Sequence, residues 1–254
     1  MTNQISLALA QLEKSEHMET LFAVESGSRA WGFASADSDY DVRFVYRMPK
    51  DQYLAVTPLR DVIERPGDPM DLSGWDIKKF LFLLGNSNPS CFEWTRSPTL
   101  YYYDHRWAEV EDVLLKFFSP RKVLPHYISM AKHNYREHMR GGQSDRVRLK
   151  KYLYIMRPLL CARWIEQHPG EGPPPMPLYD VMLGTEFPCE VWAILHQLVI
   201  RKQAGDELSE GPVSPILNGF IDREIVRLTA FADTVPHITP PLGELDEVFR
   251  RTIE

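Results

Sequence analysis

The chain has 254 residues, enough for one large domain or two small ones, and its 44% hydrophobic content is ample for a buried core. Its formal net charge of −6 argues against a broad non-specific nucleic-acid surface, because phosphate binding draws on clustered Lys and Arg. It contains no apolar run of about eighteen residues and no secretion signal, so we expect a cytoplasmic protein without a membrane anchor.

Residues 4–18 predict an amphipathic helix, because Ile5, Leu9 and Leu12 recur on one side of it. The stretch that follows, residues 20–48, predicts two strands joined by a short helical segment and a polar loop. We expect the helix to cover one face of the sheet to which these strands belong.

The first of these strands, Leu21 to Val24, runs directly into a Gly-Ser step at Gly27 and Ser28. Glycine can adopt backbone angles closed to other residues and lets another group approach closely. Ser28 is expected to open a helical turn, where unpaired backbone N–H groups point outward. Such a step can hold a phosphate without a cationic side chain.

The second strand is expected to begin near Tyr40. Side chains alternate across a strand, so Asp39 and Asp41 should project from the same face. Apolar residues follow, which predicts a strand packed into a core, where two like charges are unfavourable unless a cation neutralises them. Mg²⁺ suits such oxygen ligands, and paired ions would clamp the attacking and leaving oxygens of a phosphoryl or nucleotidyl transfer. The alternative is that Asp37, Ser38 and Asp39 are only turn formers.

The segment GSRAWGFASADSDYD resembles the GS…DxD signature of the DNA polymerase β-type nucleotidyltransferase superfamily. Together with SDYDVR, DLSGWDIKKFL, NPS…FEW and KKYLYIMRPLL, it is similar to a branch of predicted nucleotidyltransferases of RNA-repair type. The resemblance covers roughly residues 20–165 and is weaker beyond them.

This resemblance implies specific roles for the residues already named. In the superfamily the Gly-Ser step binds the incoming triphosphate and the two aspartates hold metal, so Gly27, Ser28 and Arg29 are expected at the nucleotide. Asp39 and Asp41 are expected to hold two Mg²⁺ ions, with Mn²⁺ as an alternative. A third carboxylate comes from a neighbouring strand.

The third carboxylate is expected on a hairpin. Residues 59–65 and 70–74 predict its two strands, because Pro66-Gly67-Asp68-Pro69 between them is a strong turn signal. We assign the role to Asp71, which lies between apolar residues on the second strand and matches the family pattern.

Three other acids are rivals for this role, namely Asp61, Glu64 and Asp76. Asp76 also has a structural explanation, because Ser73 and Asp76 are spaced like the two ends of a capping box that starts a helix. The choice between Asp71 and Asp76 therefore stays open at this stage.

The rest of the chain reads as helical. One helix runs from Asp76 to Gly85-Asn86, a second is capped by Asn88-Pro89-Ser90, and no clear strand follows. The proline-rich residues 168–177 predict a connector. Further helices are expected at 105–118, 121–140, 146–167, 188–204 and 220–233.

The predicted fold is therefore α+β, a small mixed β-sheet of nucleotidyltransferase type with flanking helices, followed by a helical half. We place the catalytic domain at residues 1–100 and the helical domain, which would complete the nucleotide and acceptor cleft, at residues 101–254.

The helix at 146–167 brings Lys150, Tyr154 and Arg157 into a narrow arc, at 100° per residue. Two interpretations stay open: a solvated basic face on a packed helix, or a stripe that faces the nucleotide phosphates. Pro158 is expected to bend or break this helix.

Residues 132–163 also hold the best electrostatic candidate for a phosphate-facing wall. Its basic side chains are Lys132, Arg136, Arg140, Arg146, Arg148, Lys150, Lys151, Arg157 and Arg163, set against Glu137 and Asp145.

These features predict a nucleotidyltransferase in which an acceptor hydroxyl attacks the α-phosphate of a nucleoside triphosphate and pyrophosphate leaves. Asp71 would complete the metal site nearest the acceptor and help to deprotonate the hydroxyl. The expected acceptor is an RNA end, with a protein or small-molecule hydroxyl as alternatives. A nucleotide sensor without catalysis is the competing hypothesis.

Overall fold

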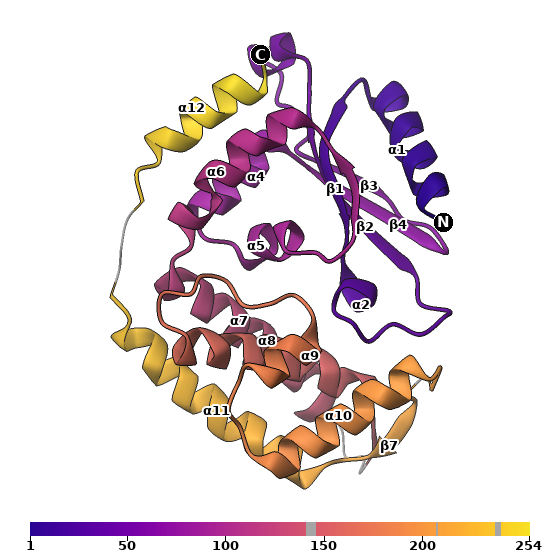
Figure 1. The fold of residues 1–254 in the computed structure, drawn as a ribbon, viewed down its shortest axis with the longest axis vertical. Coiled ribbons are helices and arrows are strands. Elements are labelled where there is room, and N and C mark those ends of the chain that lie inside the picture. Colours follow the sequence, from indigo (N-terminus) through magenta and orange to yellow (C-terminus); the bar gives the residue numbers. More distant parts are fainter. Residues whose placement is uncertain (141–145, 207, 237–239) are drawn as a thin grey trace. The chain divides into compact units, whose positions relative to one another are not determined.

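The computed structural model describes residues 1–140, 146–206, 208–236 and 240–254, without the side chains of residues 139 and 140 (Figure 1). The chain forms two compact units, and neither is a continuous stretch. Unit 1 comprises Met1–Ala30, Asp39–Phe118 and Thr239–Glu254, whereas unit 2 comprises Trp31–Ser38 and Ser119–Ile238.

Unit 1 is built on a five-stranded mixed sheet with the strand order β3-β4-β2-β1-β5. The β2 and β4 strands are parallel, and the other neighbouring pairs are antiparallel. The strands are β1 (Glu19–Glu25), β2 (Tyr40–Arg47), β3 (Val62–Arg65), β4 (Met70–Asp76) and β5 (Leu100–Tyr103). Its helices are α1 (Thr2–Glu16), α2 (Gly27–Ala30), α3 (Lys50–Tyr53), α4 (Ile77–Gly85), α5 (Pro89–Thr95), α6 (Ala108–Leu114) and α12 (Gly243–Thr252), with 3₁₀ turns at His105–Trp107 and Leu115–Phe117.

The sheet of unit 1 is covered by helices on both faces (Figure 1). On one face α1 buries Ile5, Leu9 and Leu12 against a core that includes Val42 and Phe44 of β2. On the other face aromatic rings pack closely, as where the Phe22 and Trp107 rings stack at 4.6 Å. The amphipathic first helix and the mixed α+β class are confirmed.

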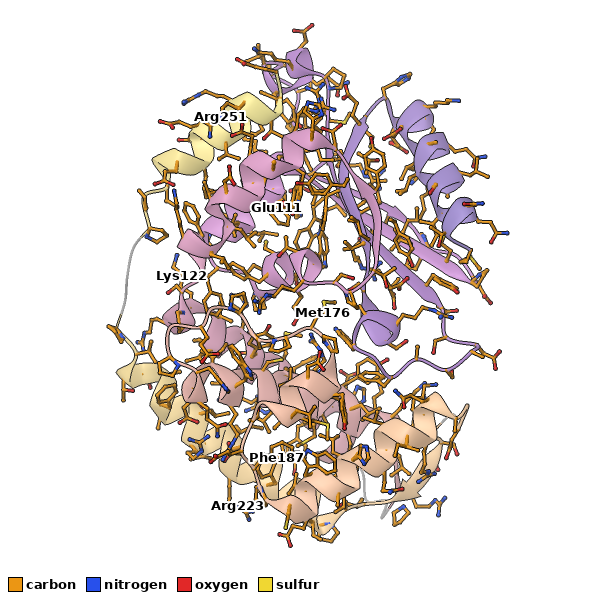
Figure 2. The ribbon with its side chains drawn as sticks, viewed as in Figure 1. Glu111, Lys122, Met176, Phe187, Arg223 and Arg251 are labelled. Carbon is orange, nitrogen blue, oxygen red and sulfur yellow. The ribbon has the colours of Figure 1, made fainter. Side chains whose placement is uncertain are left out.

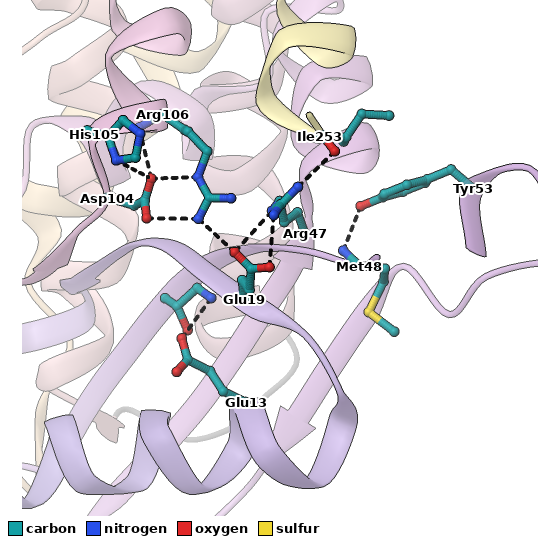
Figure 3. A network of polar contacts seen from close by, with 10 residues as sticks. Glu13, Glu19, Arg47, Met48, Tyr53, Asp104, His105, Arg106 and Ile253 are labelled. Carbon is teal, nitrogen blue, oxygen red and sulfur yellow. Dashed lines mark hydrogen bonds and ion pairs between the residues drawn. The ribbon is translucent and has the colours of Figure 1, made fainter. Parts of the chain in front are cut away.

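The end of the sheet at Glu19 and Arg47 is fastened by ion pairs (Figure 3). The Glu19 carboxylate accepts from Arg47 at 2.8 Å and from Arg106 at 2.7 Å. Arg106 also pairs with Asp104 at 2.8 Å, and Arg47 donates to the carbonyl of Ile253 at 2.8 Å. The end of the sheet away from the Gly-Ser step is therefore closed by structural contacts.

The α12 helix belongs to unit 1 although it comes last in the chain. Leu245 and Val248 are its buried apolar residues, and Figure 2 labels Arg251, which donates to Glu109 of α6 at 2.7 Å. Glu244 at the start of α12 accepts from Lys116 at 2.8 Å. These contacts attach α12 to the helices of unit 1.

The expectation that no strand follows the first two downstream helices is wrong. The short β5 strand pairs with β1 at the edge of the sheet, and the predicted domain boundary at residue 100 falls inside it. With only four residues, three of them tyrosines, β5 is too short for a clear alternating pattern, which is why the sequence does not reveal it.

Unit 2 is mainly helical, and within its described residues β6 pairs with β7 in a two-stranded sheet. Its elements are α7 (Pro120–Tyr135), a π turn at Arg136–Arg140, β6 (Arg146–Arg148), α8 (Lys150–Gln167), α9 (Leu178–Leu183), α10 (Cys189–Gln203), β7 (Glu210–Pro212) and α11 (Pro215–Thr234). The proline-rich connector is confirmed, since no helix or strand lies between α8 and α9.

The α8 helix forms the centre of unit 2, and twelve of its residues are buried. It runs without interruption through Pro158, so the expected break at this proline is wrong. The segment Trp31–Ser38 also packs into this unit: Leu178 donates to the Trp31 carbonyl at 2.9 Å, and Gln203 donates to the Gly32 carbonyl at 2.8 Å. Phe187, labelled in Figure 2, packs against Phe220 of α11.

Within the described ranges, the helices are all too short or too polar to cross a lipid bilayer.

Candidate active site

The Gly-Ser step lies directly against the start of β2. Gly27 has a φ of +56°, and a Cβ atom placed on it would lie 1.9 Å from Oδ2 of Asp41. Ser26 donates its backbone N–H to the Asp41 carbonyl at 2.8 Å. Only glycine therefore fits at position 27, both for its backbone angle and for the carboxylate that fills the space of a side chain.

Asp41 faces a second carboxylate on the neighbouring strand. In the parallel pairing of β2 and β4, Asp41 is in register with Asp71. Paired strands lie about 4.8 Å apart, so the two side chains are neighbours on one face. The side chains are about one-third exposed, at 30% for Asp41 and 35% for Asp71. The structure therefore brings together two of the three acids selected from the sequence.

Arg43 bridges these two carboxylates. It follows Asp41 by two residues, so both side chains lie on the same face of β2. Its Nη2 donates to Oδ1 of Asp41 at 3.1 Å, and its Nη1 donates to Oδ2 of Asp71 at 2.9 Å. Sequence reasoning missed this residue, although its spacing of two from Asp41 on a strand was a usable signal.

Asp39 lies just before β2, which begins at Tyr40, and it is exposed. Its carbonyl accepts from Nε of Arg29 at 3.2 Å, and the Arg29 guanidinium sits 3.8 Å from the centre of the Tyr40 ring. The prediction that Asp39 and Asp41 share a strand face does not apply, because Asp39 is outside the strand. Arg29 thus holds the backbone at Asp39.

Glu25 is a second residue that sequence reasoning missed. It is 1% exposed, and its Oε1 accepts the backbone N–H of Asp41 at 2.7 Å. The Tyr101 hydroxyl of β5 donates to its other oxygen. Burial raises the pKa of Glu25, and these two donors partly oppose that rise. Glu25 therefore fixes the backbone from which the Asp41 carboxylate projects.

The electrostatics of Asp41 show a site with crowded negative charge. Burial raises the pKa of its carboxyl most, and the charges of Asp71 and Asp39 raise it further. The guanidinium of Arg43 opposes this rise. Asp39 contributes to this rise although it lies outside β2, and its part in a metal site stays a prediction.

The carboxylate oxygens of these residues are of the type that binds a magnesium ion. Among the residues that the structure describes, no three His, Cys, Asp or Glu side chains are grouped closely enough to hold a metal ion. Mg²⁺, however, usually takes one or two carboxylates together with waters and the phosphates of its substrate. Asp41 and Asp71 supply that number of oxygen donors from adjacent strands, and Asp39 would be needed for a second ion.

Asp76, the rival of Asp71, lies at the other end of β4, in register with Tyr46. Its Oδ1 accepts the N–H of Lys78 at 2.8 Å and so caps α4, while the Tyr53 hydroxyl donates to its Oδ2 at 2.7 Å. The prediction that Ser73 caps this helix is wrong, because β4 continues through Ser73 to Asp76.

The other two rivals lie on or near β3 and are exposed: Asp61 pairs with Lys79 at 3.2 Å, and Glu64 is opposite Ser73 of β4. Of the four acids considered, Asp71 alone is in register with Asp41.

We expect Asp76 to make stability depend on pH. Burial raises the pKa of its carboxyl to about 6, whereas an unfolded chain has a value of about 3.9. The folded protein binds this proton more tightly, so the resulting stability is fully present below about pH 4 and is lost as the pH rises through 6. Asp76→Asn keeps an acceptor for the helix cap and removes the charge.

Denaturant unfolding of both proteins at several pH values tests this. As the pH rises from 4 to 7, the free energy of unfolding of Asp76→Asn should increase relative to that of the wild type by up to about 3 kcal/mol. A difference between the two proteins that does not change with pH would show that Asp76 keeps an ordinary pKa.

The residues predicted on the helical stripe all belong to unit 2. Arg157 is 2% exposed: its guanidinium lies 4.6 Å from the centre of the Trp31 ring and donates to the Met176 carbonyl at 3.2 Å (Met176 is labelled in Figure 2). Tyr154 is 36% exposed and touches Trp31 edge-on, and Lys150 is partly exposed. The stripe is therefore exposed only at its N-terminal end, and its role at the nucleotide stays a prediction.

The structure describes only part of the basic segment at residues 132–163. Arg148 is exposed and Lys151 is partly exposed, and the charges of both lower the pKa of His138, although burial lowers it most. The side chain of Arg140 and the residue Asp145 lie outside the described part of the chain.

Comparison with known proteins identifies the family of the chain. A family model described as RlaP, the RNA repair pathway DNA polymerase beta family, matches residues 1–251. The chain is also 37% identical over 257 residues to the uncharacterized protein YcgL of Bacillus subtilis (strain 168), covering 100% of this chain and 97% of that protein. A match over nearly the whole length includes both units. The chain therefore belongs to the RNA repair pathway DNA polymerase beta family.

Proposed function

We propose that the protein is a metal-dependent nucleotidyltransferase that moves a nucleoside monophosphate from a nucleoside triphosphate to an acceptor hydroxyl at an RNA end. The observation that carries this proposal is the register of Asp41 and Asp71 on adjacent parallel strands, next to the Gly27-Ser28 step. Membership in a polymerase β-like RNA repair family supports the reaction class and the choice of RNA.

Each residue has a distinct part in this proposal. Asp41, Asp71 and Asp39 would hold divalent ions, which supply charge stabilisation and an activated acceptor oxygen when bound. Asp71 would also receive the proton of the acceptor hydroxyl. Glu25 keeps the Asp41 backbone in place through its 2.7 Å contact, so that the carboxylate stays beside Gly27.

The Gly-Ser step would hold the triphosphate. Because α2 has only four residues, its helix dipole is small, and phosphate binding would depend on the Ser28 hydroxyl and on nearby backbone N–H groups. Arg29 donates to the Asp39 carbonyl and packs on the Tyr40 ring. Its role would therefore be to hold the loop beside the nucleotide in place.

An acceptor screen tests the proposal. Protein, Mg²⁺ and a triphosphate labelled at the α-phosphate should label an RNA end, and Asp39→Ala and Asp41→Ala should each abolish the labelling. Asp61→Asn is the matched control. Asp61 is an exposed acid whose backbone contacts Asp76, and Asp76 lies at the end of β4 away from Asp71. This variant should label RNA at the wild-type rate. Label transfer that survives both alanine substitutions would refute the assignment.

The same screen separates the competing hypotheses. Labelling of a protein or small-molecule hydroxyl, with no RNA labelled, would overturn the choice of acceptor while leaving the reaction class intact. Tight binding of magnesium nucleotide in calorimetry, with no product from any acceptor after long incubation, would instead identify a nucleotide sensor. The observation that favours a protein without catalysis is the bridge that Arg43 makes between Asp41 and Asp71, because it occupies both carboxylates that the transferase needs for metal.

A further inference from the structure

The guanidinium of Arg43 donates to four oxygen atoms of β2 and β4. Besides the two carboxylate contacts, its Nη1 donates to the carbonyl of Val42 at 3.2 Å and to that of Asp71 at 3.4 Å. The side chain is 21% exposed. A planar guanidinium presents its donors in a fixed fork, so it can contact two neighbouring carboxylates together.

The Arg43 bridge uses the same two carboxylates that the proposed function assigns to a metal ion. A guanidinium group carries a positive charge. A divalent cation bound to the same carboxylates would lie close to this charge and be repelled by it, and the partial solvent exposure of the group reduces this repulsion without removing it. The two cations therefore compete for one pair of acids.

We propose that Arg43 is an internal counter-cation, which holds Asp41 and Asp71 in the metal-free protein and releases them when a divalent ion binds. This inference rests on the proposed function, since it takes Asp41 and Asp71 as metal ligands. Arg43 is then a positioning residue: it keeps the two carboxylates apart from other partners and sets the affinity of the site for metal.

A purely structural ion pair makes a different prediction. If Arg43 only stabilised the sheet, its removal would lower stability without tightening metal binding. Arg47 provides the matched control, because it lies four residues further along β2, on the same face, and pairs with Glu19 at 2.8 Å. Both arginines bind acids on a neighbouring strand, but only Arg43 binds Asp41 and Asp71.

Titration with Mn²⁺ alone, followed by electron paramagnetic resonance of the free ion, measures the effect. Arg43→Gln should bind Mn²⁺ about tenfold more tightly than the wild type, the change expected when two competing, partly exposed ion pairs of up to about 1 kcal/mol each are removed. Arg47→Gln should bind Mn²⁺ as the wild type does. Adding Asp71→Asn to Arg43→Gln should abolish the gain, which locates it at this pair of acids.

Thermal unfolding gives a second readout. In chelator, Arg43→Gln should melt at a lower temperature than the wild type, because two neighbouring carboxylates lose their counter-charge, and Mn²⁺ should raise its melting temperature more than it raises that of the wild type. If Arg43→Gln does not fold, Arg43→Lys replaces it: the lysine keeps the charge but not the fork, so the gain in affinity should be smaller than tenfold.

Unchanged or weaker Mn²⁺ binding by the folded Arg43 variants would overturn the inference, whatever the result of the acceptor screen. A gain in affinity that depends on Asp71, together with failure to transfer any nucleotide, would leave the inference standing and overturn the transferase assignment. The two failures are therefore distinguishable.

Discussion

Asp71→Asn should reduce nucleotidyl transfer on the order of a thousandfold, the scale of losing one electrostatic contact to developing charge. Asp71 is the acid in register with Asp41, and asparagine at this position would remove a negative charge from a site that must hold divalent cations. The fold should persist, because the ion pair that Asp71 makes with Arg43 is 35% exposed at the carboxylate and is worth at most about 1 kcal/mol.

Asp76→Asn is the matched control, since Asp76 is on the same strand but at its other end. It should transfer nucleotide at close to the wild-type rate, because its contacts are with the α4 cap and the Tyr53 hydroxyl. The measurement is initial rate with Mg²⁺, paired with melting temperature in chelator. A well-folded but inactive Asp76→Asn beside an active Asp71→Asn would reverse the assignment of the third acid.

Gly27→Ala should reduce transfer by at least about a hundredfold, the cost of moving a reacting group by roughly 1 Å. The added methyl group would lie 1.9 Å from Oδ2 and 2.7 Å from Cγ of Asp41, so the carboxylate or the loop must move. The positive φ adds about 1–2 kcal/mol of backbone strain, and the clash adds about 1–3 kcal/mol. Activity and the free energy of unfolding should therefore fall together.

Gly170→Ala separates the strain from the clash. Gly170 has a φ of +87°, and a Cβ atom there would meet nothing within 4 Å. This variant should lose only the backbone contribution of about 1–2 kcal/mol and keep its full activity. Equal activity of Gly27→Ala and wild type would show that the tight contact between Gly27 and Asp41 is not needed for the reaction.

Much of the sheet could be predicted because its signals are local. A Gly-Ser step after an apolar strand, a polar loop and a second apolar strand are all visible within residues 20–48, and the turn at residues 66–69 sets the β3-β4 hairpin. The α1 helix was predicted for the same reason, since Ile5, Leu9 and Leu12 repeat at helical spacing.

The contacts that define the site could not be predicted in the same way, because they depend on strand register. Nothing local places Asp71 opposite Asp41, or shows that Arg43 reaches across to it. Glu25 looks like the last residue of an ordinary strand, and its role depends on Tyr101, which is distant in sequence. Side-chain patterns identify the chemistry, whereas pairing between strands decides which groups meet.

The helix stripe shows a second limit of local reasoning. Lys150, Tyr154 and Arg157 share an arc of α8, but the arc does not reveal what covers it. In the structure Trp31 comes from a segment more than a hundred residues earlier and lies on the Arg157 guanidinium. Burial of a charged side chain by such a segment cannot be read from the periodicity of the helix.

The position of α12 has a consequence for synthesis on the ribosome. Unit 1 receives its last helix from residues 243–252, after the whole of unit 2 has been made. Until these residues emerge, the surfaces of α4 and α6 that contact α12 are uncovered, and Arg47 lacks the carbonyl of Ile253. The sheet that carries Asp41 and Asp71 can therefore start to form early, but the nascent chain exposes apolar surface that a chaperone could bind until translation is nearly complete.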